Sequence, residues 1–327
     1  MKEYYDKKAV SNSGMGNINP EQGGSPAKYK SVVLEREISL DTPSLENGKL
    51  IHLYVEDPEA FIVADVDKPT AMLAEWIESV QPLISGHWDE FSIIPQNEEL
   101  KKHALLSKGD RYKSIKDEDK SWLKFQEGFN YLKFLINKEG KIALTVSQKQ
   151  VINNCITSLR DNKLSTSLLF NESLFNTELN ELPIYWTERV NDVDLKCKAL
   201  LDRVIINEKE KMARLVDLKT TGKPLANFKN SFEYYRYYRQ MAWYKHALSK
   251  YLFEEYDTYF TIEVYIVAVE TNYLHECKVF EVSNKYLEKG VEEYTRLIED
   301  IASCKSTNDW STWRDESFGL IKLDLDV

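Results

Sequence analysis

The stretch KALLDRVIINEKEKMARLVDLKTTG, residues 198–222, decides the fold. Two short runs of β-branched and apolar residues flank a charged turn, which is typical of a β-hairpin. A hairpin that turns at Lys209-Glu210 sets Asp202 directly opposite Asp217. Directly opposite side chains lie about 4.5–5.5 Å apart at Cβ, close enough for two carboxylates to share one divalent cation. A register shifted by one residue would place them on opposite faces of the sheet.

Asp217 and Lys219 are two positions apart in the second run, so both point to the same face. Two close carboxylates repel each other in a buried site unless a cation lies between them. Oxygen ligands of this kind suit Mg²⁺. Lys219 could orient or deprotonate a water molecule, or stabilise charge on a phosphate. The pattern by itself also fits an ordinary surface hairpin that carries an Asp–Lys pair.

Composition narrows the protein class. The chain has 327 residues, 43% hydrophobic and 29% charged, which predicts a globular protein, and its net charge of −10 opposes non-specific nucleic-acid binding. It contains no apolar stretch long enough to span a membrane. No apolar segment follows the charged residues at its start, as it would in a secretory signal, so we expect a cytoplasmic protein. The four cysteines form no CxxC pair, so we expect neither a zinc finger nor an iron–sulfur cluster.

Hydrophobic periodicity predicts the remaining elements. Helical spacing recurs at residues 43–55, 70–80 and 120–136 and from residue 147, whereas strand-like runs begin near residue 182. A helix over residues 231–251 interrupts the strands, and a last helix follows over residues 285–304. This order predicts one α/β domain with a small mixed central sheet flanked by helices. We expect a flexible lead-in (1–24), a helical N-terminal lobe (25–181), a catalytic core (182–305) and a tail (306–327).

The helix after the hairpin adds polar and basic residues. Gln240 and Tyr244 are four positions apart and therefore share one helical face. Six basic residues and one acidic residue, Glu233, lie between residues 219 and 245, which suggests a surface that follows phosphates or a solvated helix face. The basic residues are Lys219, Lys223, Lys229, Arg236, Arg239 and Lys245.

Together these motifs resemble the PD-(D/E)XK nuclease superfamily, which has a restriction-endonuclease-like core. More closely, the chain is similar to the RecE-type phage exonucleases related to lambda exonuclease. The resemblance rests on Asp202, on DLKTT at 217–221 and on QMAWY at 240–244. Further matches are GKLIHLYVEDPEAF (48–61), CKALLD (197–202) and SNSGMGNINPEQGGSPAKY (11–29).

The resemblance implies a role for each matching residue. The expected metal ligands are His52, Asp202, Asp217 and the backbone carbonyl of Leu218. The expected catalytic residues are Lys219, Gln240 and Glu188, of which Glu188 matches the family's upstream acid. The expected DNA-binding residues are Ser25, Lys28, Arg236, Arg239 and Tyr244, where Ser25 begins a helix that could receive a terminal phosphate.

The resemblance also implies an activity and partners. We expect Mg²⁺-dependent hydrolysis of DNA from duplex ends, 5′→3′, with Mn²⁺ able to substitute, in support of phage-type recombination. Expected partners are double-stranded DNA ends, a single-strand annealing protein and further copies of this chain in a ring, with no membrane. A phage-encoded protein would act in the cytoplasm of its bacterial host.

Three alternatives stay open. A Cas4-like or AddB-like nuclease would carry an iron–sulfur cluster, and the clustered C-terminal cysteines of such enzymes are missing here. A restriction-type endonuclease would share the core. A catalytically silent DNA-binding module on the same scaffold would bind DNA without cutting it in any metal.

Overall fold

The computed structural model describes residues 2–36, 43–86, 88–108, 112, 114–170, 176–272 and 274–311. The chain divides into two compact units, one of residues 1–48 with 155–327 and one of residues 49–154. This division differs from the expected one, because the segment that precedes residue 49 belongs with the sheet. Helices α4 (Pro43–Glu56) and α9 (Val146–Asp161) each cross the boundary between the units.

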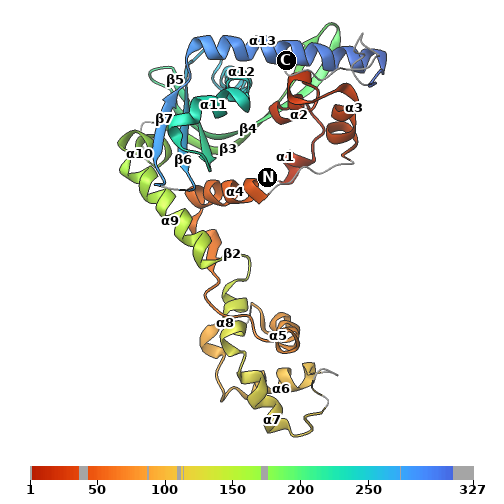
Figure 1. Cartoon of the computed structure of the whole chain (residues 1–327), viewed down its shortest axis with the longest axis vertical. Coiled ribbons are helices and arrows are strands. Elements are labelled where there is room, and N and C mark those ends of the chain that lie inside the picture. The colour runs from red at the N-terminus through yellow and green to blue at the C-terminus, as the bar shows by residue number, and fades with distance from the viewer. Residues whose placement is uncertain are drawn as a thin grey trace, which may run out of the picture. The chain divides into compact units, whose positions relative to one another are not determined.

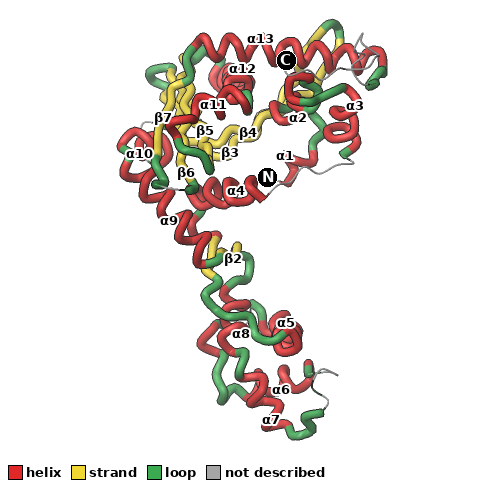
Figure 2. Tube along the Cα trace, in the orientation of Figure 1, coloured by secondary structure: helices red, strands yellow, loops and turns green. Residues whose placement is uncertain are grey.

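The first unit is built on a five-stranded sheet in the order β3-β4-β5-β6-β7. Only β5 and β6 are parallel, and the other neighbours are antiparallel, so the sheet is mixed as predicted. Figure 2 shows the strands gathered in yellow, and Figure 1 shows their labels. The strands are β3 (Thr177–Val190), β4 (Val193–Asn207), β5 (Met212–Thr221), β6 (Thr261–Glu270) and β7 (Cys277–Glu281).

Helices complete this unit. Trp243 of α12 is fully buried and donates through Nε1 to the carbonyl of Lys198 on β4 (3.1 Å), which holds α12 against the sheet. Gly290 of α13 lies against the backbone of Tyr238, where an added Cβ would come within 2.4 Å of the carbonyl oxygen, so α12 and α13 pack closely. The helices are α1 (Lys2–Asp6), α2 (Asn12–Gly16), α3 (Pro26–Tyr29), α10 (Lys163–Leu169), α11 (Phe228–Tyr234), α12 (Tyr237–Tyr256) and α13 (Asn284–Thr307).

The N-terminal segment is ordered rather than a flexible lead-in. Val10 donates to the carbonyl of Lys196 and accepts from the N–H of Lys198, both at 2.8 Å, so it pairs with β4. Met15 and Ile18 are fully buried in the core of the first unit. The polar composition of residues 1–24 predicts flexibility, because it contains only a few apolar residues that can pack against the core. Most of the expected tail, residues 312–327, lies outside the described residues.

The second unit has a helical core of its own around Trp76, Phe125 and Leu132. The expected helix over residues 120–136 is two helices, broken at Gly128, where an added Cβ would lie 2.0 Å from Ile77. The elements are β1 (Phe61–Val63), α5 (Ala71–Ile84), α6 (Glu98–Ser107), α7 (Glu118–Gln126), α8 (Phe129–Asn137) and β2 (Ile142–Leu144), with β1 and β2 parallel. Among the described residues, no helix is long and apolar enough to cross a membrane.

Candidate active site

The β4–β5 hairpin has the predicted register, but its ladder ends one row early. The last pair is Arg203 with Val216, directly before Asp202 and Asp217. Beyond that pair, a side chain replaces the backbone as hydrogen-bond acceptor. Oδ2 of Asp202 accepts from the N–H of Leu218 at 2.9 Å. Asp202 therefore lies at the point where the two strands separate.

Asp202 also stands where the β3–β4 ribbon is distorted. The β3–β4 register sets Glu181 opposite Asp202, yet this row is missing from the ladder, and Glu181 has a left-handed backbone with φ 47°. Such a conformation is uncommon outside glycine and often marks a functional site. Core-facing residues of β4 change from odd to even positions here, from Cys197, Ala199 and Leu201 to Val204 and Ile206.

The distortion brings two carboxylates together. A carboxylate oxygen of Glu181 lies within 4.8 Å of one of Asp202. Burial raises the pKa of the Asp202 carboxyl to about 6, although the charge of Lys219 and the N–H of Leu218 favour its ionised form. The structure thus supplies an acidic neighbour for Asp202 that the sequence did not predict.

Asp217 and Lys219 form a buried ion pair on β5. Nζ of Lys219 lies 2.6 Å from Oδ2 of Asp217, and the side chains are 16% and 1% exposed. Burial works against the Lys219 ammonium, but the charges of Asp217 and Asp202 raise its pKa above the ordinary value. Tyr237 closes the site from α12, because its ring centroid lies 5.1 Å from the same Nζ.

Helix α12 brings the expected glutamine and tyrosine to this site. Nε2 of Gln240 donates to Oη of Tyr244 at 2.9 Å, so the two side chains share a face as predicted. Burial raises the pKa of Tyr244 well above its ordinary value, and the charges of Asp217 and Asp202 add to the shift. Tyr244 therefore lies near the acids within the protein.

Helix α1 is a part of the site that the sequence did not reveal. The buried Lys198 donates through Nζ to the carbonyls of Tyr4 (2.8 Å) and Lys7 (2.7 Å), and Arg36 donates to the carbonyl of Tyr5 (2.7 Å). Cations suit the C-terminal end of a helix, where carbonyls lack partners. Two cations thus hold α1 in place.

Tyr5 of α1 interacts electrostatically with two of the acids. Burial raises the pKa of Tyr5, and the charges of Glu181 and Asp202 raise it further. Tyr5 is nevertheless well exposed.

Glu188 lies away from this cluster, contrary to the expectation that it is the upstream acid. It is paired with Leu195, seven residues before Asp202 on β4, which corresponds to roughly 23 Å along an extended strand. Its Oε2 accepts from Nε1 of Trp186 (2.9 Å) and lies 3.0 Å from Nε2 of His246. Glu181 occupies the position beside Asp202 that Glu188 was expected to fill.

The two arginines expected to bind DNA are engaged within the protein. Arg239 is 2% exposed and donates to Glu293 (2.9 Å), Gln22 (2.9 Å) and Asn12 (3.0 Å), so it fastens the N-terminal segment to α12 and α13. Arg239 is therefore a structural residue, which corrects the expectation. Arg236 forms an ion pair with Glu21 at 2.6 Å and keeps a partly exposed side chain.

Ser25 begins α3 as predicted. Its Oγ accepts from the N–H of Lys28 at 3.2 Å, and Nζ of Lys28 donates to the carbonyl of Gly23 at 3.2 Å. DNA binding by either residue stays a prediction.

His52 lies on α4 and is half-buried. It follows Gly48 by four residues, which places both on one face of the helix. An added Cβ at Gly48 would lie 2.9 Å from Oγ1 of Thr220 on β5, so α4 passes close to this strand at Gly48. Metal binding by His52 stays a prediction.

The donor set of the first unit suits a divalent cation. Carboxylate oxygens of Glu181 and Asp202 lie close together. The buried Asp217 directly follows Val216, whose partner in the β4–β5 ladder is Arg203, the residue after Asp202. The N–H and carbonyl of one strand residue point to the same side, so the carbonyl of Leu218 faces the side of Asp202. Hard oxygen ligands of this kind bind Mg²⁺ or Mn²⁺.

Comparison with known proteins adds independent findings. The profile of a family described as a PDDEXK-like domain of unknown function (DUF3799) matches residues 19–316. No curated protein sequence matches the chain. A crystal structure described as "Putative exonuclease" from Eubacterium rectale is similar, with a TM-score of 0.49, 10% sequence identity and coverage of 99% of this chain and 95% of that one.

Proposed function

The chain belongs to the PDDEXK-like family of the PD-(D/E)XK nuclease superfamily, and on that premise we propose that it is a metal-dependent exodeoxyribonuclease acting at duplex ends. The proposal rests on one observation above the others. The carboxylate of Asp202 is hydrogen-bonded to the backbone N–H of Leu218, between Asp217 and Lys219. Two acids and a lysine are thereby held together, as the proposed hydrolysis requires.

The proposed metal ligands are Asp202, Asp217, Glu181 and the carbonyl of Leu218, with His52 as a further ligand from α4. A bound Mg²⁺ or Mn²⁺ would supply Lewis-acid stabilisation of charge on the phosphate and lower the pKa of a water molecule. Three carboxylates outweigh the single charge of Lys219, so a cation would relieve their mutual repulsion.

The remaining polar residues position the reacting groups. Lys219 places an ammonium at the site, where it can orient a water molecule or stabilise charge on the scissile phosphate. Asp217 fixes that ammonium through the 2.6 Å ion pair, and Tyr237 covers it. Gln240 and Tyr244 form a hydrogen-bonded pair on α12 that supports the site or the DNA.

Action at duplex ends, 5′→3′ polarity and a role in phage-type recombination are proposed from the resemblance to RecE-type exonucleases. A ring of several copies would reconcile the net charge of −10 with DNA binding, since an acidic exterior is compatible with a positive channel. A single-strand annealing protein would then receive the remaining strand.

The test is degradation of a linear duplex labelled separately at its 5′ and 3′ ends, with Mg²⁺, with Mn²⁺ and with EDTA. We expect metal-dependent loss of label from the 5′ ends and no cutting of a circular duplex. Lys219→Ala should abolish the reaction while circular dichroism shows an intact fold.

Other results would revise the proposal. Cutting of the circle would indicate an endonuclease on the same core. A folded protein that binds DNA ends and cleaves neither substrate in any metal would overturn the enzymatic proposal in favour of a silent binding module.

A further inference from the structure

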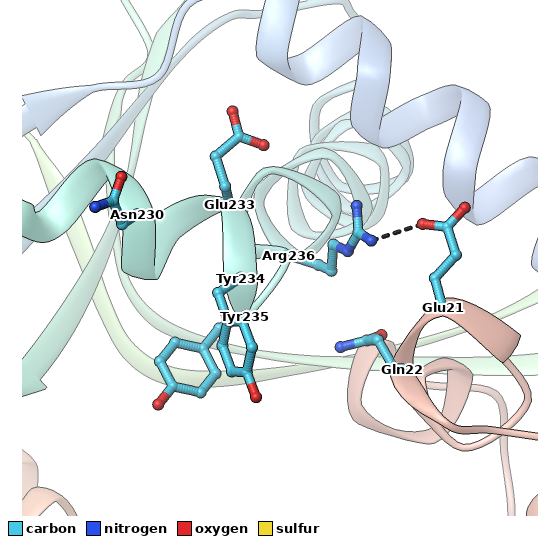
Figure 3. A pocket seen from close by; sticks show the side chains of 7 residues that line it. All are labelled: Glu21, Gln22, Asn230, Glu233, Tyr234, Tyr235 and Arg236. Atoms are coloured by element: carbon cyan, nitrogen blue, oxygen red, sulfur yellow. Dashed lines mark hydrogen bonds and ion pairs between the residues drawn. The ribbon is translucent and has the colours of Figure 1, made fainter. Parts of the chain in front are cut away.

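A polar pocket lies where α11 meets α12. Its volume is about 640 Å³, which is within the range of about 300–1,000 Å³ that holds small ligands. Tyr234, Tyr235 and Arg236 line it from the turn between the helices, and Glu21 and Gln22 line it from the N-terminal segment (Figure 3). The pocket is large enough for a nucleotide.

Two neighbouring tyrosines at this pocket are exposed. Tyr234 is 74% and Tyr235 48% exposed, and their ring centroids lie 5.0 Å apart in an edge-to-face arrangement. Figure 3 shows both rings on one side of the turn and Glu233 on the other. Arg236 has a left-handed backbone with φ 57°, which ends α11 and fixes the turn that presents them. Adjacent exposed aromatic rings on a fixed turn are suited to stacking against a flat ligand.

A row of aromatic rings connects these tyrosines to the candidate active site. The ring of Tyr235 stacks on Tyr237, with centroids 5.6 Å apart and planes inclined by 27°. Tyr237 in turn lies over Nζ of Lys219, 5.1 Å from its ring centroid. A strand whose phosphate reaches Lys219 would therefore bring its neighbouring bases to Tyr235 and Tyr234.

The acids of the pocket do not oppose a nucleic acid strongly, because each is paired with a cation. Glu21 binds Arg236 at 2.6 Å, and Glu233 binds Lys289 at 2.9 Å. Lys223 and Lys229 are exposed in the segment between β5 and the tyrosines and can follow phosphates.

We propose that Tyr234 and Tyr235 stack on unpaired nucleobases of the DNA strand whose phosphate lies at Lys219. This inference rests on the proposed nuclease function and names the form of DNA that the site takes: locally single-stranded nucleotides rather than intact duplex. Stacking on aromatic side chains is tolerant of sequence because every base has a π-face. The amide nitrogen of Gln22 can donate to base edges, while its amide oxygen already accepts from Arg239, and the amide of Asn230 can donate or accept.

The experiment measures binding without cleavage. The full-length protein is titrated in EDTA against a short fluorescent single-stranded DNA, and against the same DNA carrying abasic nucleotides. Variants are Tyr234→Ala and Tyr235→Ala, with Tyr234→Trp and Tyr235→Phe to retain the rings. Tyr259→Ala is the matched control, since Tyr259 is 78% exposed and does not line the pocket.

We expect each alanine variant to bind the normal strand about tenfold more weakly than the wild type, since stacking contributes this much per base. The tryptophan and phenylalanine variants and Tyr259→Ala should bind as the wild type does. On the abasic strand, the alanine variants should lose less than about twofold, because there is no base left to stack.

Two outcomes would overturn the inference. One is normal binding by both alanine variants, and the other is an equal loss on normal and abasic strands, which would indicate contact with the backbone. Cleavage of duplex DNA by the wild type in Mg²⁺ is measured in parallel. Cleavage together with normal binding by the variants overturns the stacking alone, whereas base-dependent binding without cleavage overturns only the nuclease proposal.

Discussion

Strand β3 carries a glutamate in each half, one in a regular part of the sheet and one in a distorted part. Glu188 lies in a regular antiparallel ladder and is held by Trp186 and His246. Glu181 lies where the ladder is interrupted, with a left-handed backbone and the carboxylate of Asp202 within 4.8 Å. Regular pairing surrounds Glu188 with groups that stabilise its charge, whereas the distorted row concentrates negative charge.

This difference separates structural from functional acids. Burial would raise the pKa of Glu188, but hydrogen bonds from His246 and Trp186 lower it below its ordinary value, so its charge stabilises the fold. In the other half of β3, the carboxylates of Glu181 and Asp202 lie side by side, and we propose that a divalent cation binds there. Strain and like charges at one place are typical of sites maintained for function.

The largest expected effect is on the acids of the distorted row. Asp202→Asn and Asp217→Asn should each reduce DNA hydrolysis on the order of 10³-fold, because a neutral amide neither holds a cation nor balances Lys219. The measurement is the initial rate on linear duplex in Mg²⁺, with circular dichroism as the control for folding. Retention of more than a tenth of the rate by a folded Asp202→Asn protein would contradict this assignment.

Arg239 is a buried cation that, like Glu188, stabilises the fold. Arg239→Met should lower the free energy of unfolding by about 3–5 kcal/mol, because it removes the closer cation (2.9 Å) from the buried carboxylate of Glu293 and leaves only Arg236 at 3.8 Å among the ion pairs described for it. Urea unfolding measures the change, and Arg296→Met on the exposed side of α13 is the matched control, expected to lose less than about 1 kcal/mol. A change in the salt dependence of DNA binding, with unaltered stability, would instead return Arg239 to the DNA surface.

The matched pair Glu181→Gln and Glu188→Gln tests the comparison itself. Glu181→Gln should lower hydrolysis about 100-fold with little change in stability, because it removes a carboxylate from the acidic row. Glu188→Gln should leave hydrolysis within about threefold and lower the free energy of unfolding by about 1–2 kcal/mol. If the two variants exchanged these effects, Glu188 would be the upstream acid after all.

The smallest effect is the pH dependence at Glu188. Its folded-state pKa is lowered, so its contribution to stability is present above the ordinary pKa of 4.5 and is lost as the pH falls through the folded value. The stability difference between wild type and Glu188→Gln should therefore shrink from about 1–2 kcal/mol at pH 7 towards zero in acid. Urea unfolding at several pH values measures it, and a difference that does not change with pH would mean that the charge of Glu188 contributes nothing.

Much of the core could be predicted because the information is local. The turn at Lys209-Glu210 and the alternation of the two strands determine the β4–β5 register. The helix spacing of Gln240 and Tyr244 likewise predicts the shared face on which their hydrogen bond forms. Turn position and periodicity are properties of short segments, so one sequence is enough to read them.

Glu181 could have been found in the same way. Asn191 and Asp192 both have positive φ and form the two-residue turn between β3 and β4, which sets Glu181 opposite Asp202. The left-handed backbone of Glu181 itself has no signal in the sequence. It arises where the ribbon changes its core-facing side, and that depends on packing from distant segments.

Other errors have the same origin. The burial of Arg239 depends on Glu293 and Asn12, which are far away in sequence, whereas the basic segment around it predicts a surface residue. The packing of residues 2–24 depends on β4, which Val10 joins at Cys197, in a distant part of the sequence. In both cases the structure depends on contacts with residues distant in sequence, which cannot be read from the composition of the segment.

The position of a bound metal tests the account most directly. Crystals of the full-length protein soaked in Mn²⁺ would be measured for anomalous scattering at the manganese edge. We expect a peak beside Asp202, within coordination distance of Glu181 or Asp217, that disappears in Asp202→Asn crystals. A peak at Glu188 and His246, or manganese bound nowhere near Asp202 in a protein that cleaves DNA, would contradict it.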